Sequence, residues 1–260
     1  MKKAILFILS IAFIVTSSCK KDDIVDGEWQ EPIEQDTPYT KRVTFKTSDD
    51  VEVTADVYHV NNDYPVIILC HQEDWSRGEY LYIAPLFNEL GYNCMAIDQR
   101  SGENTNQVVN RTAWFYKAKA KGIPEDYVDA EKDVIAAVDY AHKLWGKNVM
   151  LLGSGYSSGL VLKIAKENNK VNVVLAFSPG EYYSPLLNLK SAITGLHKPT
   201  FITSSNMEAA IAKEIFDVIP TSYKVQFVPT GPGFHGARVL TPTYSGSKEY
   251  WVAVKDFLGK

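Results

Sequence analysis

The chain has 260 residues, of which 45% are hydrophobic and 22% are charged, a composition that suits one large globular domain or two small ones. Its formal net charge of -4 and its isoelectric point near 5.8 argue against nucleic acid as a partner. The sequence also contains no block of like charges that would form a basic arm. These properties exclude the common classes of nucleic-acid-binding proteins.

The first 18 residues have the pattern of a secretory signal peptide. Lys2 and Lys3 precede an apolar stretch over residues 4–15 that only Ser10 interrupts. The stretch is too short to span a bilayer, which takes about 20 apolar residues. It does fit the apolar core of a signal peptide, so we predict that residues 1–18 are removed.

The end of this leader resembles a bacterial lipoprotein signal. Thr16-Ser17-Ser18-Cys19 is similar to the lipobox, although Thr16 stands where leucine is usual. The resemblance implies a lipid on Cys19 that anchors the protein in the bacterial cell envelope, facing the periplasm or the cell surface. An ordinary signal peptide with an incidental cysteine is the alternative. Residues 19–38 are acidic and indicate a flexible tether, which leaves residues 39–260 as the folded domain.

After the tether the sequence alternates between strand and helix patterns. Residues 41–60 alternate apolar and polar side chains around a polar turn, which predicts a β-hairpin. Apolar stretches then predict buried strands at residues 65–70, 92–97, 148–153, 171–178, 199–204 and 224–230. Helical patterns fall at residues 79–90, 125–145, 158–168, 207–219 and 247–259, and residues 98–124 are expected to form a long loop.

This alternation predicts an α/β protein with a doubly wound, mostly parallel sheet, opened by the antiparallel hairpin and covered by helices on both faces. Residues 179–198 are too few to build a large lid, so we expect a minimal lid and an open pocket. Cys70 and Cys94 fall on neighbouring strands with an offset of roughly 13 Å along the strands. That separation is too large for a disulfide, and we expect two buried free thiols.

A G-x-S-x-G pattern, Gly155-x-Ser157-x-Gly159, lies between a predicted strand and a predicted helix. This context is typical of a nucleophile elbow, in which a serine is held in a sharp strand-to-helix turn. The stretch fits neither the dinucleotide-binding pattern nor the P-loop pattern. We therefore predict Ser157 as a nucleophile and the backbone N–H of Ser158 as one donor to a developing oxyanion.

A serine nucleophile needs a general base and a carboxylate that orients the base. His235 lies in a glycine-rich loop after the last predicted strand, at the edge where a doubly wound sheet gathers its site. The loop after residues 199–204 offers Glu208 as the carboxylate, and Glu181 is the alternative. We predict His235 as the base and Glu208 as the orienting acid.

The loop after the first predicted parallel strand is expected to complete the site. The backbone N–H of Gln72 or Glu73 is the predicted second oxyanion donor. We expect His71 to orient this loop through its ring N–H, and we place His71, Trp75 and Tyr156 around the pocket. No group of histidines and cysteines has the spacing of a zinc site, so we expect neither a metal nor a cofactor.

Together these motifs resemble those of the α/β-hydrolase family over nearly all of residues 40–260. The matching segments are His71-Gln72, Asp98-x-Arg100-x-Gly102, the Ser157 motif, the acid Glu208 and His235-Gly236. The sequence looks like the dienelactone-hydrolase-related branch of small esterases without a lid, except that dienelactone hydrolases have a cysteine where this chain has Ser157. The resemblance implies hydrolysis of a small carboxylic ester through an acyl-enzyme.

Two alternatives stay open at this point. Peptidases, thioesterases and acyltransferases use the same triad. The acids of the loop that contains Glu73 and Asp74 would lie beside the oxyanion, which also fits a catalytically inactive binding lipoprotein that retained the fold. In each case the expected partners are a small molecule and the membrane that holds Cys19.

Overall fold

The computed structural model describes residues 37–118 and 122–260. The predicted signal peptide, Cys19 and residues 20–36 of the predicted tether lie outside the described residues. Within the described ranges, no helix is both long enough and apolar enough to cross a membrane.

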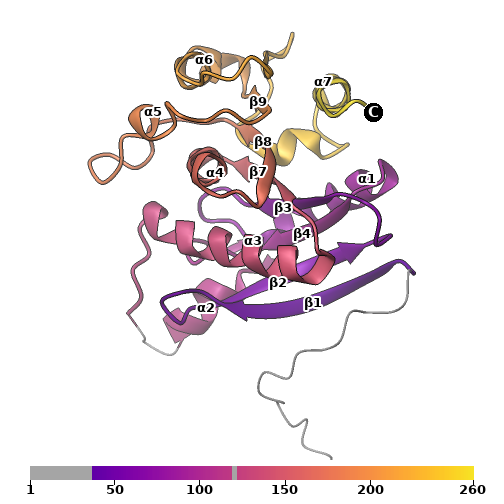
Figure 1. Ribbon diagram of the computed structural model, residues 1–260, viewed down its shortest axis with the longest axis vertical. Helices are drawn as coiled ribbons and strands as arrows, with labels where there is room; N and C mark the ends of the chain where they lie inside the picture. The colour runs from indigo at the N-terminus through magenta and orange to yellow at the C-terminus, as the bar shows by residue number, and fades with distance from the viewer. Residues whose placement is uncertain (1–36, 119–121) are drawn as a thin grey trace, which may run out of the picture. The chain divides into compact units, whose positions relative to one another are not determined.

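Eight strands form one mixed sheet with the order β1-β2-β4-β3-β7-β8-β9-β10 (Figure 1). The β1–β2 and β2–β4 pairs are antiparallel, and every other neighbouring pair is parallel. The strands are β1 (Tyr39–Lys46), β2 (Glu52–His59), β3 (Val66–Cys70), β4 (Asn93–Ile97), β7 (Val149–Ser154), β8 (Val171–Phe177), β9 (Thr200–Thr203) and β10 (Lys224–Phe227). The predicted mostly parallel sheet with an opening hairpin is confirmed.

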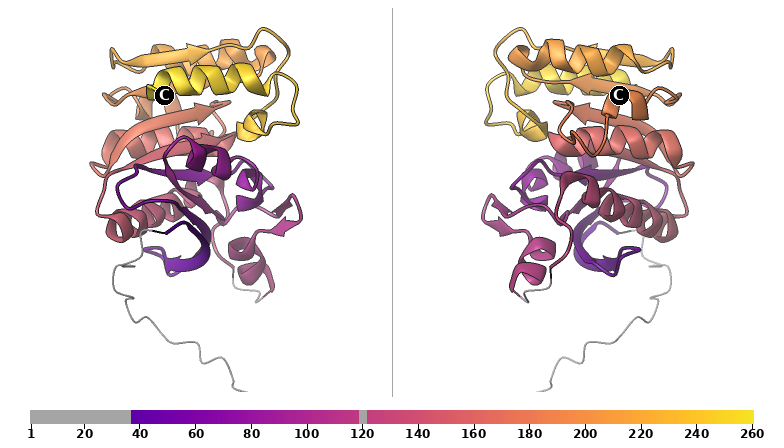
Figure 2. Two further views of the ribbon diagram at one scale, coloured as in Figure 1. Left: turned by 90° about the vertical axis from the view of Figure 1, so that its right-hand side faces the viewer. Right: turned by 90° about the vertical axis from the view of Figure 1, so that its left-hand side faces the viewer.

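Helices cover both faces of this sheet, and each face has its own apolar core. One core is formed with α3 (Glu131–Trp145), α4 (Tyr156–Glu167), α5 (Leu189–Ala192) and α6 (Ala209–Asp217). The other is formed with α1 (Ala84–Glu89), the short 3-10 helix η4 (Ala237–Leu240) and α7 (Ser247–Leu258). The side views in Figure 2 show α7 on one side of the sheet and α3 and α4 on the other. Because β3 and β4 are covered on both faces, all of their residues are buried, which explains their apolar sequences.

The segment expected to be a long loop after β4 contains structure, so that prediction is wrong. It forms a small two-stranded ribbon, β5 (Asn104–Thr105) and β6 (Val108–Val109), followed by the helix α2 (Arg111–Ala118). The helix predicted over residues 125–145 begins with the 3-10 helix η2 (Tyr127–Ala130) and continues as α3. The ribbon turns at Asn106 and Gln107, which both have positive φ angles. The side chain of Asn110 then accepts a hydrogen bond from Ala113 N–H at 2.9 Å and caps α2. The strands are too short, and the turn too unusual, to leave a periodic pattern.

Cys70 and Cys94 are free and buried, as predicted. In the register of β3 and β4, Cys94 pairs with Ile67 and Cys70 pairs with Ile97, which puts the two cysteines three positions apart along the strands. Cys70 also belongs to the core that contains α3, whereas Cys94 belongs to the core that contains α1 and α7. The sheet therefore separates the two thiols.

Candidate functional site

Loops from five parallel strands meet at the carboxyl end of the sheet, where the order of the strands places β3, β7, β8, β9 and β10 side by side. The loop after β3 leads into the 3-10 helix η1 (Arg77–Tyr80), and the loop after β9 contains the 3-10 helix η3 (Asn206–Glu208). The predicted acid Glu208 and the predicted base His235 come from two of these loops.

The structure brings Glu208 and His235 together. Oε1 of Glu208 lies 2.6 Å from Nδ1 of His235, and its Oε2 accepts hydrogen bonds from the hydroxyls of Ser178 (2.9 Å) and Ser205 (2.7 Å). Burial works against the Glu208 carboxylate, but the hydrogen bonds from His235 and the serines outweigh it and lower the pKa of Glu208 to about 2. The same contact with Glu208 raises the pKa of His235. The imidazole is therefore fixed with Nδ1 on the acid and Nε2 directed away from it.

The alternative acid, Glu181, has another role. Its carboxylate accepts hydrogen bonds from the backbone N–H groups of Leu189 (2.7 Å) and Lys190 (2.9 Å), at the start of α5. It is therefore engaged at a helix N-terminus, where a negative charge is favourable.

Ser178 is a member of the site that the sequence analysis missed. Its φ angle is 57°, and its hydroxyl accepts a hydrogen bond from Gly236 N–H at 3.0 Å while it donates to Glu208. Ser178 therefore ties the end of β8 to both the acid and the histidine loop. Its signal in the sequence is a single small polar residue directly after a buried strand.

The sharp turn between β7 and α4 is centred on Gly155. This residue has φ 55° and ψ -126°, a conformation that is strained for any residue with a side chain. A Cβ atom on Gly155 would lie 2.9 Å from Nε2 of His235. Two positions earlier, a Cβ atom on Gly153 would lie 2.5 Å from the carbonyl oxygen of Ser157, so the turn closes only over small residues. The position that faces the histidine is therefore a glycine and has no nucleophilic side chain.

Ser157 is not placed as a nucleophile, so this prediction is wrong. It is the second residue of α4 and is fully buried. Its hydroxyl donates to the carbonyl oxygen of His71 at 2.5 Å and accepts a hydrogen bond from the side-chain amide of Gln99. The helix begins at Tyr156, two residues before the expected start at residue 158, and this shift moves the strained turn from Ser157 to Gly155.

Two of the predicted oxyanion donors have other partners. The N–H of Ser158 donates to the carbonyl oxygen of Gly155 at 3.0 Å, and the N–H of Gln72 donates to Oε2 of Glu79 at 3.0 Å. These two assignments are wrong because the helix and the buried Glu79 carboxylate already use those N–H groups.

Glu73 contributes a side chain at this place. Its Oε1 lies 3.9 Å from Nε2 of His235, and its Oε2 would lie 2.8 Å from a Cβ atom on Gly155. Among the described residues, neither Oε2 of Glu73 nor Nε2 of His235 has a hydrogen-bond partner. A carboxylate thus stands beside His235, next to the place that a side chain at position 155 would occupy.

His71 and Tyr156 are buried beneath the loop after β3 and the turn at Gly155. The ring of His71 hydrogen-bonds through Nδ1 to the carbonyl oxygen of Gln72 (2.7 Å) and accepts a hydrogen bond at Nε2 from the N–H of Gln99 (3.0 Å). Burial lowers the pKa of His71 to about 4, so the ring is neutral and its Nδ1–H is the donor. Tyr156 is buried and stacks on Tyr127 at 4.5 Å between ring centroids. Both residues lie in the interior and do not line the cavity described next.

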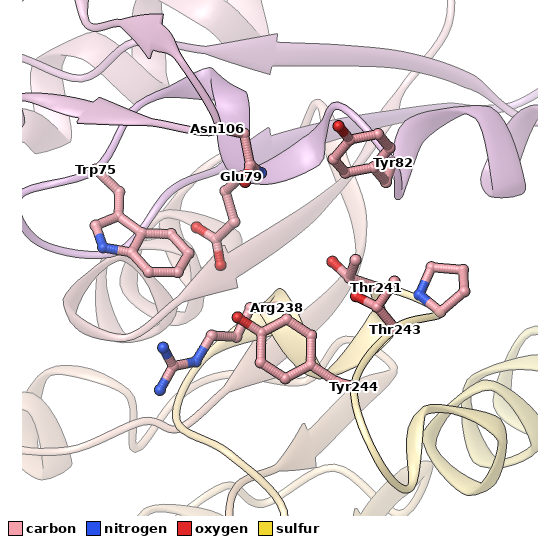
Figure 3. A pocket seen from close by; sticks show the side chains of 9 residues that line it. Trp75, Glu79, Tyr82, Asn106, Arg238, Thr241, Thr243 and Tyr244 are labelled. Carbon is pink, nitrogen blue, oxygen red and sulfur yellow. The ribbon is translucent and has the colours of Figure 1, made fainter.

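A cavity of about 610 Å³ opens beside the loop that follows β3 (Figure 3). Its walls come from that loop, from the β5–β6 ribbon and from the segment after His235. The lining residues are Trp75, Glu79, Tyr82, Asn106, Arg238, Thr241, Pro242, Thr243 and Tyr244. Trp75 is one of the residues that line this cavity. Glu79 connects the cavity to the elbow because its Oε1 accepts a hydrogen bond from the hydroxyl of Ser154, the residue before Gly155, at 2.6 Å. Among the described residues, no group of three acidic, histidine or cysteine side chains is arranged to hold a metal ion.

Comparison with known proteins gives matches in structure but not in sequence. No protein-family model matches the sequence. No curated protein matches it either. A dienelactone hydrolase from Anabaena variabilis superposes with a TM-score of 0.66 at 15% identity, over 85% of this chain and 97% of that one. An esterase from Pyrococcus furiosus superposes with a TM-score of 0.63 at 18% identity, over 85% and 92% of the two chains. A cold-adapted esterase from an Arctic intertidal metagenomic library superposes with a TM-score of 0.61 at 13% identity, over 85% of this chain and 94% of that one.

Similarity at this level of identity establishes the fold alone. At one end of the sheet, two antiparallel pairs of strands lead into the parallel part. A strand-to-helix turn and a histidine–acid pair lie beyond the carboxyl edge of the parallel part, and this arrangement explains the matches. The chain has the α/β-hydrolase fold, shared with dienelactone hydrolase and these esterases.

Proposed function

We propose that this protein binds a small molecule at the carboxyl end of the sheet and does not form an acyl-enzyme. One observation carries the proposal: the elbow position that faces Nε2 of His235 is occupied by Gly155, which has no side chain to attack a carbonyl. The only serine that the motif offers, Ser157, is buried. Its hydroxyl is hydrogen-bonded to the carbonyl oxygen of His71 and to the side-chain amide of Gln99.

The electrostatics of the elbow also disfavour acyl transfer. An ester passes through an anionic tetrahedral intermediate, which hydrolases stabilise with N–H donors. Here the Gln72 N–H is taken by Glu79, and the carboxylate of Glu73 stands 3.9 Å from Nε2 of His235. Like charges repel each other, so an anionic intermediate that forms beside the Glu73 carboxylate would be disfavoured.

A second candidate function is hydrolysis without a covalent intermediate. The imidazole of His235 is oriented by Glu208, and its Nε2 has no hydrogen-bond partner among the described residues. This arrangement suits a general base that takes a proton directly from a water molecule. The hydrolases that share the fold support this candidate as a class of chemistry.

A fluorophosphonate probe and a panel of short-chain aryl and acetyl esters separate the candidates. We expect no labelling of the wild-type protein, no labelling of Ser157→Ala and no ester turnover by either. Turnover without labelling that is lost in His235→Ala would instead establish the second candidate. Labelling of a serine in the wild-type protein would refute both candidates and restore the acyl-enzyme mechanism.

We further propose that the protein is anchored to the cell envelope by a lipid on Cys19. The lipobox-like segment before Cys19 supports this proposal. In bacterial cells, the wild-type chain is expected to incorporate radiolabelled palmitate and to sediment with membranes, and Cys19→Ala is expected to do neither. Unchanged incorporation of palmitate by Cys19→Ala would contradict the anchor.

A further inference from the structure

Glu79 is a buried acid at the elbow that takes no part in either candidate function. It lies in η1 and is 1% exposed, and Figure 3 shows its side chain beside the cavity. Its Oε2 accepts the N–H of Gln72 at 3.0 Å, and its Oε1 accepts the hydroxyl of Ser154 at 2.6 Å. A buried carboxylate costs free energy unless hydrogen bonds compensate its desolvation, and each oxygen of Glu79 has one. Glu79 therefore binds the loop after β3 to the end of β7.

The hydroxyl of Ser154 extends this contact to the loop that carries His235. Ser154 is the last residue of β7, and its Oγ accepts the N–H of Ala237 at 2.7 Å while it donates to Glu79. The loop lies directly against this oxygen, because a Cβ atom on Gly236 would come within 2.5 Å of it. The chain of Glu79, Ser154 and Ala237, here named the Ser154 bridge, joins η1, β7 and the start of η4 through buried groups.

The preceding residue of the loop is held in the same way. The N–H of Gly236 donates to the hydroxyl of Ser178 at 3.0 Å, and this hydroxyl donates to Glu208 at 2.9 Å. The two residues that follow His235 thus each donate to a serine hydroxyl that donates in turn to a carboxylate. Glu208 also contacts the imidazole itself, whereas the acid of the Ser154 bridge reaches only the backbone of the loop.

The Ser154 bridge is complete only while Glu79 is ionised. An ionised carboxylate accepts at both oxygens, but a protonated one has to donate at one of them. Its Oε2 faces the N–H of Gln72, which cannot accept, so the proton would lie on Oε1 and be donated to Ser154 Oγ. The hydroxyl proton of Ser154 then loses its acceptor in the interior, which costs free energy. Protonation of Glu79 therefore weakens the hold on the His235 loop.

The surroundings of Glu79 allow it to change charge near neutral pH. Burial is the main cause that raises its pKa to about 7, against its two hydrogen bonds and the charges of His235 and Arg238. The other titratable or charged groups in η1 and on the elements packed against it are Arg77, Tyr80, Cys70, Cys94 and Asp98. Arg77 is paired with Asp98, and burial raises the pKa of Tyr80 and of both thiols above their usual ranges. Neither Tyr80 nor a thiol therefore ionises in the range where Glu79 does.

We infer that Glu79 is a positioning residue for His235: ionised, it fixes the backbone of the histidine loop through Ser154, and protonated, it releases that backbone. The contact of the imidazole with Glu208 does not pass through the Ser154 bridge, so the change concerns how firmly the loop is held and not which acid orients the ring. The inference goes beyond the proposed function and applies equally to a site that only binds and to one that activates water.

Hydrogen exchange of single backbone amides, measured by NMR on the full chain, tests the inference. The protection factor of the Ala237 amide is expected to be about fivefold higher at pH 8 than at pH 6, the effect of one hydrogen bond. Glu79→Gln keeps the shape of the side chain but cannot ionise, so it is expected to show the lower protection at both pH values. Ser154→Ala changes no charge and should show the same lower protection. The double variant should lose no more than either single variant, because both changes break one bridge.

The matched control is Thr112→Val, which removes another buried hydroxyl that accepts a backbone N–H, that of Thr54 at 2.9 Å. Thr112 lies on α2 and has no part in the Ser154 bridge. The control is expected to change the protection of Ala237 by less than about twofold at either pH, as for an independent site. Thermal melts establish that each variant is folded, and Ser154→Ala decides the question if Glu79→Gln is not.

Three results would overturn the inference. The first is equal protection of Ala237 at both pH values in the wild type. The second is a pH dependence that persists in Glu79→Gln, which would assign the change to His235 itself. The third is full protection of Ala237 in Ser154→Ala. None of them bears on the missing nucleophile, because fluorophosphonate labelling measures that separately.

Discussion

At position 155 the backbone has the strained conformation of a nucleophile elbow, but the residue has no side chain. We therefore expect Gly155→Ser to gain reactivity toward a fluorophosphonate probe, because it puts a hydroxyl next to the imidazole of His235. The new Cβ would lie 2.9 Å from Nε2 of His235 and 2.8 Å from Oε2 of Glu73, so both flexible side chains must shift to admit it. The variant should also lose about 1–3 kcal/mol of stability from the positive φ angle. Labelling should disappear in Gly155→Ser with His235→Ala, and it should rise when Glu73→Gln removes the neighbouring charge. A stable but unreactive Gly155→Ser protein would show that the pair of His235 and Glu208 cannot activate a serine.

Glu208 makes the stability of the protein depend on pH. Its pKa is about 2 in the folded protein and about 4.3 in an unfolded chain, so the proton binds more weakly to the folded state. Glu208 therefore contributes stability that is present above about pH 5 and is lost as the pH falls toward 2, on the order of 2–3 kcal/mol in all. Urea denaturation from pH 7 to pH 2 should show this loss in the wild type and a smaller loss in Glu208→Gln.

The same variant should change the titration of its partner. Because Glu208 is the main cause of the raised pKa of His235, NMR titration of Glu208→Gln is expected to give a lower pKa for that imidazole. Glu214→Gln is the control, because Glu214 forms an exposed ion pair with Lys190. Loss of this pair should change the free energy of unfolding by less than about 1 kcal/mol. An unchanged pKa of His235 in Glu208→Gln would mean that the 2.6 Å contact does not persist in solution.

Among the elements, the strands are predicted well because burial on both faces leaves a continuous apolar sequence. The start of α4 is predicted poorly because residues 153–159 contain three glycines and three serines, which suit several positions of a turn. Packing decides among them, since only a glycine at 153 can lie against the carbonyl of Ser157. His235 and Glu208 could be found because each follows a strand on the correct edge. An acid of the loop after β3 is also expected near the site, and Glu73 is that acid. The side chain of Arg238 could not be found, because only the path of the chain after His235 directs it to the cavity.

The connection between η1, α2 and the end of β4 depends on one carboxylate. Asp98 accepts hydrogen bonds from Arg77 N–H at 2.9 Å and from Arg111 N–H at 2.7 Å, and it also pairs with the guanidinium of Arg77. Asp98→Ala would leave the buried Arg77 with fewer partners, and we expect a loss of about 3–5 kcal/mol in urea denaturation. Lys46→Ala breaks an exposed pair with Asp50 and should cost less than about 1 kcal/mol. Similar small losses in both variants would contradict the structural role of Asp98.

In the molecule as a whole, the pair of His235 and Glu208 and the cavity of about 610 Å³ lie at the same edge of the sheet. Glu79 joins them, because it lines the cavity and bonds to Ser154 and to Gln72 N–H beside Gly155. A molecule bound in the cavity would therefore lie within one side chain of the elbow. The proposed binding site thus lies at the edge of the sheet where this kind of fold gathers its sites.

The two apolar cores should unfold together, because they share the central strands of the sheet. Cys70 reports on one core and Cys94 on the other, and burial raises the pKa of both thiols well above the usual range. Neither thiol should react with iodoacetamide in the native protein, since the thiolate is the reactive form. With increasing urea, mass spectrometry should find both cysteines modified along one curve that coincides with the loss of circular dichroism. Modification of one cysteine at a urea concentration that still protects the other would show that the two faces of the sheet open independently.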